Sequence, residues 1–480
     1  MNFYIERCGV PILALVAWMT CITPSLANSD ASATRALLPH EKQLLDLAAA
    51  PGGTRVLVTL RTAVDTTGRA PLAEQSRRNA IADARTAFAA DMSGSNVRLI
   101  RRYESFPIML VNVDQPALQH ILGLAYVGGV QSDRANRPQD NANDAVMDVP
   151  AAWAVGFSGA DEVVAVLDTG VQESHPFLSS NGTATRTIAA LEGCFSGAGG
   201  AIPGVSSLCP GGALSETGDP NGNLDGANCA IGGCDHGTHV AGIATGSGAY
   251  TNGNGENGVA VAANLMPLQV FSCNDPGTGT CTLESFDSDI IAALQWVHDR
   301  AVNSQYRIAA ANLSLGVSGS HYTAYCDDAA PAYKAAIDTL RNADSIATVI
   351  SAGNDAYTDG LDYPACISSA ITVAATDNSD QVAAYTNTAP FVSMYAPGTD
   401  VYSSVPVSVY GVMGGTSMSA PQVAGGFAIL QSKFGHQATV TQLLTLLQKT
   451  GKPISANGYT RPRIDVGAAV DDLFVDGFDG

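Results

Sequence analysis

From about Val149 onward, short apolar runs alternate with segments of helical periodicity, and this alternation limits the possible folds more than any other feature. The clearest helix candidate is Ser288–Ala301, in which four apolar residues share one face. Near-continuous apolar strands separated by helices are typical of a parallel sheet covered on both faces. We therefore predict a three-layer α/β domain with a mostly parallel central sheet. The strand candidates are Val163–Leu167, Leu265–Phe271, Ile308–Ser314, Ile346–Ser351 and Ile371–Ala375.

Residues 28–140 have a different organisation and predict a small α+β unit. The polar stretch Gln131–Asp144 then has the composition of a linker. In chain order, the earlier signals are a strand at Thr54–Leu60, an amphipathic helix at Arg77–Met92, a strand at Ile108–Val113 and a helix start at Asp114–Pro116.

The first 27 residues have the pattern of a secretory signal peptide. Arg7 precedes the apolar run Ile12–Ile22, and small residues follow at Ser25 and Ala27. The apolar run is too short to span about 30 Å of hydrocarbon, so it does not predict a membrane anchor. We expect the protein to be exported and to be extracellular.

Charge and cysteine usage agree with an exported globular protein. The chain is 46% apolar and only 14% charged, with a formal net charge of −20. Residues 1–140 carry +2 and the remainder carries −22, which argues against nucleic acid or an anionic membrane as a partner. Eight of the ten cysteines lie beyond residue 27, and an even number outside the cell favours four disulfides. Eight cysteines permit 105 pairings, and the sequence leaves the choice among them open. A first guess joins neighbours along the chain: Cys194–Cys209, Cys229–Cys234, Cys273–Cys281 and Cys326–Cys366.

Three local stretches together supply the groups needed for nucleophilic catalysis. Asp168 ends an apolar strand, His236 opens a helical pattern, and Ser417 follows two glycines at the start of another helix. A serine hydroxyl needs a base to remove its proton, and the base needs a carboxylate to hold its tautomer and stabilise the imidazolium. The carboxyl ends of parallel strands are where such groups usually gather.

These stretches identify the resemblance. Asp168–Gly170, His236–Gly242 and Gly415–Pro421, in that order, resemble the three signature segments of the subtilisin-like serine peptidases, and the likeness covers roughly residues 150–430. It implies that Asp168, His236 and Ser417 form a catalytic triad. A G-x-S-x-G nucleophile elbow is absent, because position 413 is Met and position 419 is Ser, and this excludes an α/β-hydrolase.

The resemblance also implies a substrate site. Ser351–Asn354 resembles the family segment whose asparagine donates to the oxyanion, so Asn354 is expected to do so together with the Ser417 N–H. The segment around Ser314, Leu315 and Gly316 resembles the strand that pairs with the substrate backbone beside the primary pocket, and Gly353 is also expected to bind substrate. His239 and His175 are interpreted as structural residues.

Metal binding is open at the sequence level. The chemistry requires no cofactor, but subtilases often bind structural calcium, and one loop spaces oxygen ligands two apart. Against this, the loop lacks the glycine and glutamate of an EF-hand, and Phe177 replaces a familiar calcium carboxylate of the family. A polar turn is the alternative. The candidate ligands are Asp219, Asn221, Asn223 and Asp225.

The sequence thus predicts a secreted, monomeric serine endopeptidase that acts on proteins and peptides. We expect a signal peptide (1–27), an inhibitory and chaperoning prosegment (28–140) and a catalytic domain (141–480), with self-cleavage between Gly128 and Val149. One alternative is a selective processing peptidase for basic sites, which the −22 charge suggests. The other is an inactive binding module on the same scaffold, against which the complete set of four site residues weighs.

Overall fold

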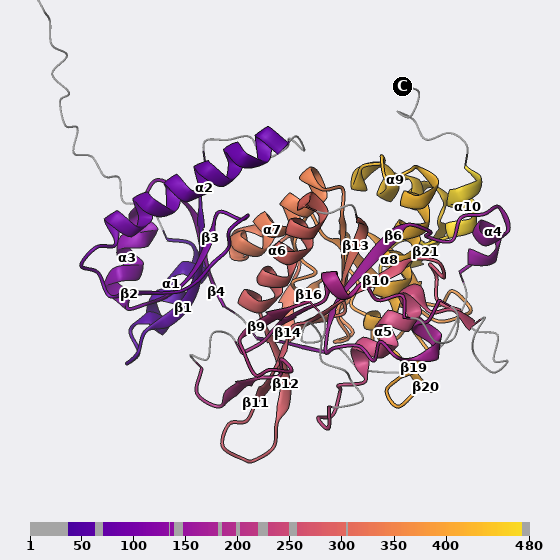
Figure 1. Cartoon of the computed structure of the whole chain (residues 1–480), viewed down its shortest axis with the longest axis horizontal. Coiled ribbons are helices and arrows are strands. Elements are labelled where there is room, and N and C mark those ends of the chain that lie inside the picture. The colour runs from indigo at the N-terminus through magenta and orange to yellow at the C-terminus, as the bar shows by residue number, and fades with distance from the viewer. Residues whose placement is uncertain are drawn as a thin grey trace, which may run out of the picture. The chain divides into compact units, whose positions relative to one another are not determined.

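A ten-stranded sheet runs through the centre of the protein in the computed structural model (Figure 1). The structure describes residues 37–62, 71–133, 135–138, 147–180, 185–197, 202–218, 229–248, 257–303 and 306–472. Neighbouring strands are parallel except at the two edges. Their order is β21 (Lys452–Ala456), β22 (Tyr459–Arg463), β18 (Met394–Pro397), β17 (Ile371–Thr376), β15 (Ala347–Ser351), β13 (Arg307–Leu313), β6 (Glu162–Asp168), β10 (Asn264–Gln269), β7 (Gly193–Phe195) and β9 (Ser215–Thr217).

The predicted fold class is confirmed, and β6, β10, β13, β15 and β17 coincide with the five predicted strands. One boundary differs: the apolar run Leu265–Phe271 does not form a single strand. The Gln269 side chain accepts a hydrogen bond from Phe271 N–H at 2.7 Å and donates to Phe271 C=O at 2.8 Å, while Val270 N–H binds Asp168 C=O. These bonds turn the chain at Val270 and send Phe271 into another sheet.

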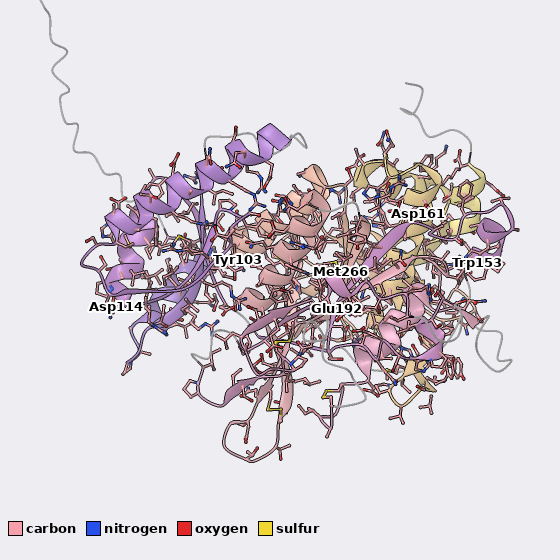
Figure 2. The ribbon with its side chains drawn as sticks, in the orientation of Figure 1. Tyr103, Asp114, Trp153, Asp161, Glu192 and Met266 are labelled. Carbon is pink, nitrogen blue, oxygen red and sulfur yellow. A yellow bond between two sulfur atoms is a disulfide. The ribbon has the colours of Figure 1, made fainter. Side chains whose placement is uncertain are left out.

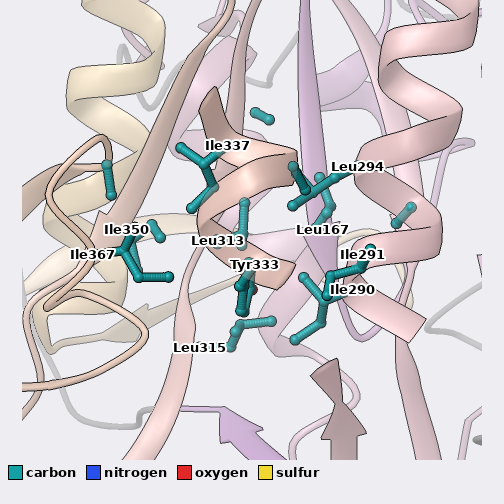
Figure 3. Close-up of a cluster of buried hydrophobic side chains, with 14 of the residues drawn as sticks. Leu167, Ile290, Ile291, Leu294, Leu313, Leu315, Tyr333, Ile337, Ile350 and Ile367 are labelled. Carbon is teal, nitrogen blue, oxygen red and sulfur yellow. The ribbon is translucent and has the colours of Figure 1, made fainter. Parts of the chain in front are cut away.

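The central sheet is buried on both faces, as its apolar strands predict. Alternate residues of β6 face opposite cores: Leu167 belongs to one apolar cluster and Val166 to the other. Figure 3 shows the first cluster, which contains Leu167 of the sheet together with Ile291 and Ile337 from two helices. The helices of this face are α6 (Asp287–Asn303) and α7 (Pro331–Ala343); those of the opposite face are α5 (His236–Thr245), α8 (Thr416–Lys433), α9 (Val440–Thr450), α10 (Val466–Asp471) and α4 (Val149–Ala154).

Two strands of a second, six-stranded sheet directly follow central strands along the chain: β11 follows β10, and β14 follows β13. A separate hairpin precedes α8. The six-stranded order is β16 (Leu361–Tyr363), β14 (Leu315–Tyr322), β5 (Ala135–Pro138), β12 (Thr282–Phe286), β11 (Phe271–Asn274) and β8 (Val205–Ser207); the hairpin is β19 (Val401–Val405) with β20 (Val409–Met413).

Residues 37–133 form an α+β region with its own apolar core. Two predicted strands match the structure at both ends, the helix predicted from Arg77 begins earlier at Pro71, and Asp114 caps the next helix as expected. Four antiparallel strands and three helices make up the region: β2 (Val97–Arg102), β3 (Ile108–Val113), β1 (Thr54–Leu60) and β4 (Val127–Ser132), with α1 (Pro39–Ala48), α2 (Pro71–Asp91) and α3 (Gln115–Gly123).

This N-terminal region packs on α6 and α7 as part of one compact unit that begins at Leu37. Leu57, Phe106 and Leu110 belong to the same apolar cluster as those helices. Tyr103 is buried at the boundary, where its hydroxyl donates to Ser288 C=O at 2.9 Å (Figure 2). The contact is therefore apolar at its centre and hydrogen-bonded at the start of α6.

The predicted linker Gln131–Asp144 is partly structured. Gln131 is fully buried at the end of β4, and residues 135–138 form β5 between β14 and β12. The polar side chains that suggested a loop have specific partners instead: Gln131 Oε1 accepts from Ala332 N–H at 2.7 Å, and Asp133 accepts from Ser288 N–H at 2.7 Å. A polar composition indicates a loop only where such partners are lacking.

All four predicted disulfides are present, and among the pairings that the sequence leaves open the structure has the one that joins neighbours along the chain. The Cα atoms of each pair lie between 5.3 and 5.9 Å apart, within the range that a disulfide can bridge. Three of them join cysteines separated by 15 residues or fewer, so they close short surface loops, while Cys326–Cys366 closes a loop of 40.

Candidate active site

The candidate site lies at the carboxyl ends of three adjacent central strands. Asp168 is the last residue of β6, Ser314 follows β13, and Asn354 comes shortly after the end of β15. The order β15-β13-β6 brings these three positions to one edge of the sheet. This is where a parallel sheet collects functional groups, because its strands all end at the same edge.

Asp168 and His236 form a buried hydrogen-bonded pair. Asp168 Oδ1 lies 2.7 Å from His236 Nδ1, and both side chains are about 1% exposed. The same oxygen accepts from Thr169 N–H at 2.8 Å, which orients the carboxylate. A carboxylate at Nδ1 selects the tautomer that leaves Nε2 free of a proton, as a general base requires.

Local contacts explain how His236 reaches Asp168. His236 is the first residue of α5, and the next residue, Gly237, donates its N–H to Thr169 Oγ1 at 3.0 Å. A Cβ at position 237 would collide with Gly170 C=O and approach the Asp168 side chain. Only glycine therefore lets the helix start this close to the end of β6.

Ser417 is the second residue of α8, and its backbone is tied to the end of β13. Its C=O accepts from Ser314 Oγ at 2.7 Å, and its own Oγ lies 3.4 Å from Ser314 C=O. Gly415, just before the helix, has φ +139°, a conformation that favours glycine. Helices α5 and α8 pack against each other, so His236 and Ser417 stand in the first turns of two contacting helices.

Asn354 has the geometry of a preoriented donor. Its Oδ1 accepts from Thr416 N–H at 3.0 Å and from Thr416 Oγ1 at 3.1 Å. Its Nδ2 is buried and has no hydrogen-bond partner among the described residues. Thr416 thus occupies the side-chain oxygen of Asn354 with two hydrogen bonds, and the Asn354 Nδ2 group remains able to donate to a bound molecule. The sequence analysis did not assign a role to Thr416. Its position directly before Ser417 was the only indication that it belongs to the site.

The predicted substrate-binding residues lie next to a peptide segment of the chain itself. Leu315 and Gly316 pair antiparallel with Pro138 and Arg137 of β5. On its other edge β5 pairs with β12. Gly353 has φ +109° and donates its N–H to Thr416 Oγ1 at 3.2 Å, which places it beside the first turn of α8. The space between β14 and β12 can thus hold an extended peptide. The sequence did not indicate that β5 would occupy it.

The two other histidines of interest are tied to backbone groups. His239 Nε2 lies 3.0 Å from Val401 C=O, and burial, together with the charge of His236, lowers its pKa to about 3. His175 Nδ1 accepts from Phe177 N–H at 3.1 Å, and burial lowers its pKa. Both therefore stay neutral at physiological pH and serve as packing and capping residues.

The candidate calcium ligands 219–225 lie outside the described residues. Within the described part of the chain, no group of three or more His, Cys, Asp or Glu side chains is arranged to hold a metal ion. No helix in that part is long and apolar enough to cross a membrane. A structural calcium ion remains a prediction from the sequence.

Comparison with known proteins shows which family the chain belongs to. Residues 159–469 match the subtilase family model. The chain is 30% identical to "Subtilisin Savinase" of Lederbergia lenta over 67% of this chain and 94% of that protein, and 28% identical to an "Alkaline protease" of Shouchella clausii over 78% and 82%. A solved cold-adapted subtilisin-like serine proteinase matches 65% of this chain and 90% of its own, at 25% identity and a TM-score of 0.46. The chain belongs to the subtilase family of serine peptidases.

Proposed function

We propose that this protein is an exported endopeptidase that hydrolyses internal peptide bonds through Asp168, His236 and Ser417. The observation that carries the proposal is the buried 2.7 Å bond between Asp168 and His236, on a chain that supplies Ser417 in the adjoining helix. No cofactor enters the chemistry.

In this mechanism Ser417 Oγ attacks the substrate carbonyl while His236 takes its proton. Asp168 holds His236 in the required tautomer and stabilises the imidazolium that forms. The tetrahedral intermediate carries negative charge on the former carbonyl oxygen, and the Asn354 Nδ2 and Ser417 N–H groups donate to it. His236 then returns the proton to the leaving amine, and water hydrolyses the acyl-enzyme by the same steps.

The substrate is proposed to bind as an extended strand between β14 and β12. Support comes from β5, which takes this place in the precursor and pairs with both neighbours. Backbone hydrogen bonds give affinity with little dependence on sequence, and they hold a segment that continues in both directions. Cleavage of internal bonds follows from such a groove.

The N-terminal region is proposed to be an inhibitory prosegment. Besides β5, two of its polar side chains satisfy the first N–H groups of the catalytic helices: Asp133 binds Ser288 at the start of α6, and Gln131 binds Ala332 at the start of α7. Helix starts carry unsatisfied N–H groups and partial positive charge, so these contacts stabilise the docked state. The same contacts support a chaperoning role, because they fix two helices against the sheet.

The test uses purified wild-type protein and the Ser417→Ala variant. Wild type should degrade casein and be blocked by a fluorophosphonate that labels one serine, found at Ser417 by peptide mapping. An intact, folded protein that neither degrades casein nor takes up the label would instead support the inactive binding module.

A further inference from the structure

A carboxyl group that the proposed mechanism does not use lies beside the candidate site. Asp362 belongs to β16 and is 1% exposed. Strand β16 pairs antiparallel with β14, the strand that also pairs with β5. In the six-stranded sheet, β14 thus separates β16 from the bound peptide segment.

The backbone around Gly353 places this carboxyl group next to the oxyanion donor. Asp362 N–H donates to Ala352 C=O at 3.1 Å. A Cβ on Gly353 would collide with the Asp362 carboxyl group and with the Asn387 side chain. The Asp362 carboxyl group therefore lies against Gly353, and the next residue, Asn354, is the proposed donor to the substrate carbonyl.

A second carboxylate completes the pair. Asp355 N–H donates to Asn387 Oδ1 at 3.0 Å, and the Asn387 side chain and the Asp362 carboxyl group both lie against Gly353, so the two acids are neighbours. Asp355 is anchored to β14, accepting from Ser318 Oγ at 2.9 Å and from Gly319 N–H at 3.1 Å. No lysine or arginine among the described residues forms an ion pair with Asp355. The side of the candidate site formed by Asn354, Asp355 and Asp362 is therefore acidic.

The electrostatics of the pair favour an incoming cation. Burial, followed by the hydrogen bond and charge of Asp355, raises the pKa of Asp362 to about 9, while Asn387 acts in the opposite direction. At neutral pH the pair thus shares a proton, as two close carboxyl groups do. A cation beside it would replace this proton and compensate both charges.

We propose that Asp362, with Asp355, makes this peptidase select lysine or arginine at the substrate residue whose carbonyl Ser417 attacks. The side chain of that residue enters between the start of β14 and Gly353, toward the two carboxyl groups. This rests on the proposed endopeptidase function and names its substrate class. The −22 charge of the chain beyond residue 140 also attracts basic substrates at long range.

The proposal is tested with fluorogenic peptides that differ only at this residue: lysine, arginine, leucine or glutamate. Wild type should have the highest kcat/KM on lysine and arginine and the lowest on glutamate. Asp362→Asn should lower the ratio of lysine to leucine kcat/KM about 10- to 100-fold, the size expected for losing a hydrogen bond to a charged group. Asp359→Asn is the matched control, because Asp359 lies in the same segment but is 59% exposed and binds His321; its ratio should stay within about twofold.

Wild type alone provides a readout that does not depend on a variant folding. The lysine-to-leucine ratio should rise between about pH 7 and pH 9, because less work is then needed to ionise Asp362, while substrate lysine stays charged up to about pH 10. The groups that face Asp362 are Asp355, the neutral Asn387 amide and Tyr357. Burial, followed by the charges of Asp355 and Asp362, raises the pKa of Tyr357.

The outcomes separate this inference from the proposed function. Wild type that cleaves leucine peptides better than lysine peptides at all pH values, with a ratio unchanged by Asp362→Asn, would overturn the selectivity. Wild type that takes up no fluorophosphonate and cleaves none of the four peptides would overturn the endopeptidase function itself.

Discussion

Acidic side chains have different partners at the boundary between the N-terminal region and the rest of the chain than they have in the candidate cleft. At their boundary two acidic side chains meet arginines: Arg101 lies 3.2 Å from Asp289, and Arg78 lies 2.9 Å from Asp299. In the cleft, Asp168 is paired with His236, while Asp355 accepts only neutral donors, Ser318 Oγ and Gly319 N–H, among the hydrogen bonds of the described residues. Arginines thus compensate acidic side chains at the boundary, whereas no lysine or arginine among the described residues forms an ion pair with Asp355 in the cleft. We expect such a difference if, as proposed, the N-terminal region is an inhibitor and the cleft receives a substrate.

Loss of the nucleophile is the strongest test of the cleft. Ser417→Ala should lower kcat by about 10⁶-fold, because the triad acts as a unit, while the fold is kept. The check is steady-state hydrolysis of peptides by purified variant, with circular dichroism as the folding control. Turnover within tenfold of wild type would show that Ser417 is not the nucleophile.

Self-processing should depend on the same serine. Wild-type precursor should cut itself between Gly128 and Val149, the part of the chain that includes β5, which pairs with β14 and β12. The Ser417→Ala precursor should keep residues 28–140 attached in a protease-deficient host. N-terminal sequencing gives the answer; equal trimming of both precursors would assign the cut to another peptidase.

Removal of the oxyanion donor should have a smaller effect. Asn354→Ala should lower kcat about 10²- to 10³-fold with KM little changed, because Nδ2 acts only on the charge that develops in the transition state. Asn387→Ala, which alters a neighbouring amide that also contacts this segment, provides a comparison. A change confined to KM would mean that Asn354 binds substrate without stabilising the intermediate.

The boundary can be weakened without touching the cleft. Asp133→Ala removes the acceptor for Ser288 N–H at the start of α6 and should lower the free energy of unfolding of the Ser417→Ala precursor by about 1–2 kcal/mol. Asp83→Ala, at an exposed position of α2, should change it far less. Urea unfolding of both variants measures this; equal values would show that the cap contributes nothing.

The pH dependence of the boundary follows from two groups that meet across it. Burial opposes protonation of His298, but hydrogen bonds with Asp344 and Glu74 raise its pKa. Burial alone would raise the pKa of Glu74, yet its bonds to His298 and Arg77 lower that pKa to about 2. The histidine contribution is full below its ordinary pKa near 6.5 and is lost as pH rises through the raised value. The glutamate contribution is present above about pH 4.5 and is lost toward pH 2.

The Ser417→Ala precursor should therefore be most stable in mildly acidic solution and lose stability toward alkaline pH. A second substitution, His298→Gln, should remove the alkaline part of this dependence. Thermal unfolding midpoints measured across the pH range check it, and His120→Gln, on the N-terminal region's helix α3, is the control. Identical profiles with and without the His298→Gln substitution would contradict the histidine's part in the boundary.

Local sequence was enough for the features that depend on neighbours along the chain. Apolar runs bounded by helices indicated the central strands, since a strand buried on both faces has no polar side chains to interrupt it. The segments around Asp168, His236, Ser417 and Asn354 identified the family because each is a compact motif with a glycine or small residues at defined places. The number of disulfides followed as well, from the even count of exported cysteines, but which cysteines pair was decided only by the structure.

Only the tertiary structure decided the features that join distant segments. Nothing near Ala135 indicates that it pairs with Phe286, and the polar residues before it read as a linker. Asp355 and Asp362 are two unremarkable acids in the sequence until β16 folds back on β14. Likewise, the bond from Thr416 to Asn354 spans 62 residues. Such contacts arise from strand pairing over long separations, where the loss of chain entropy is offset by many bonds at once, and no local pattern records the partner.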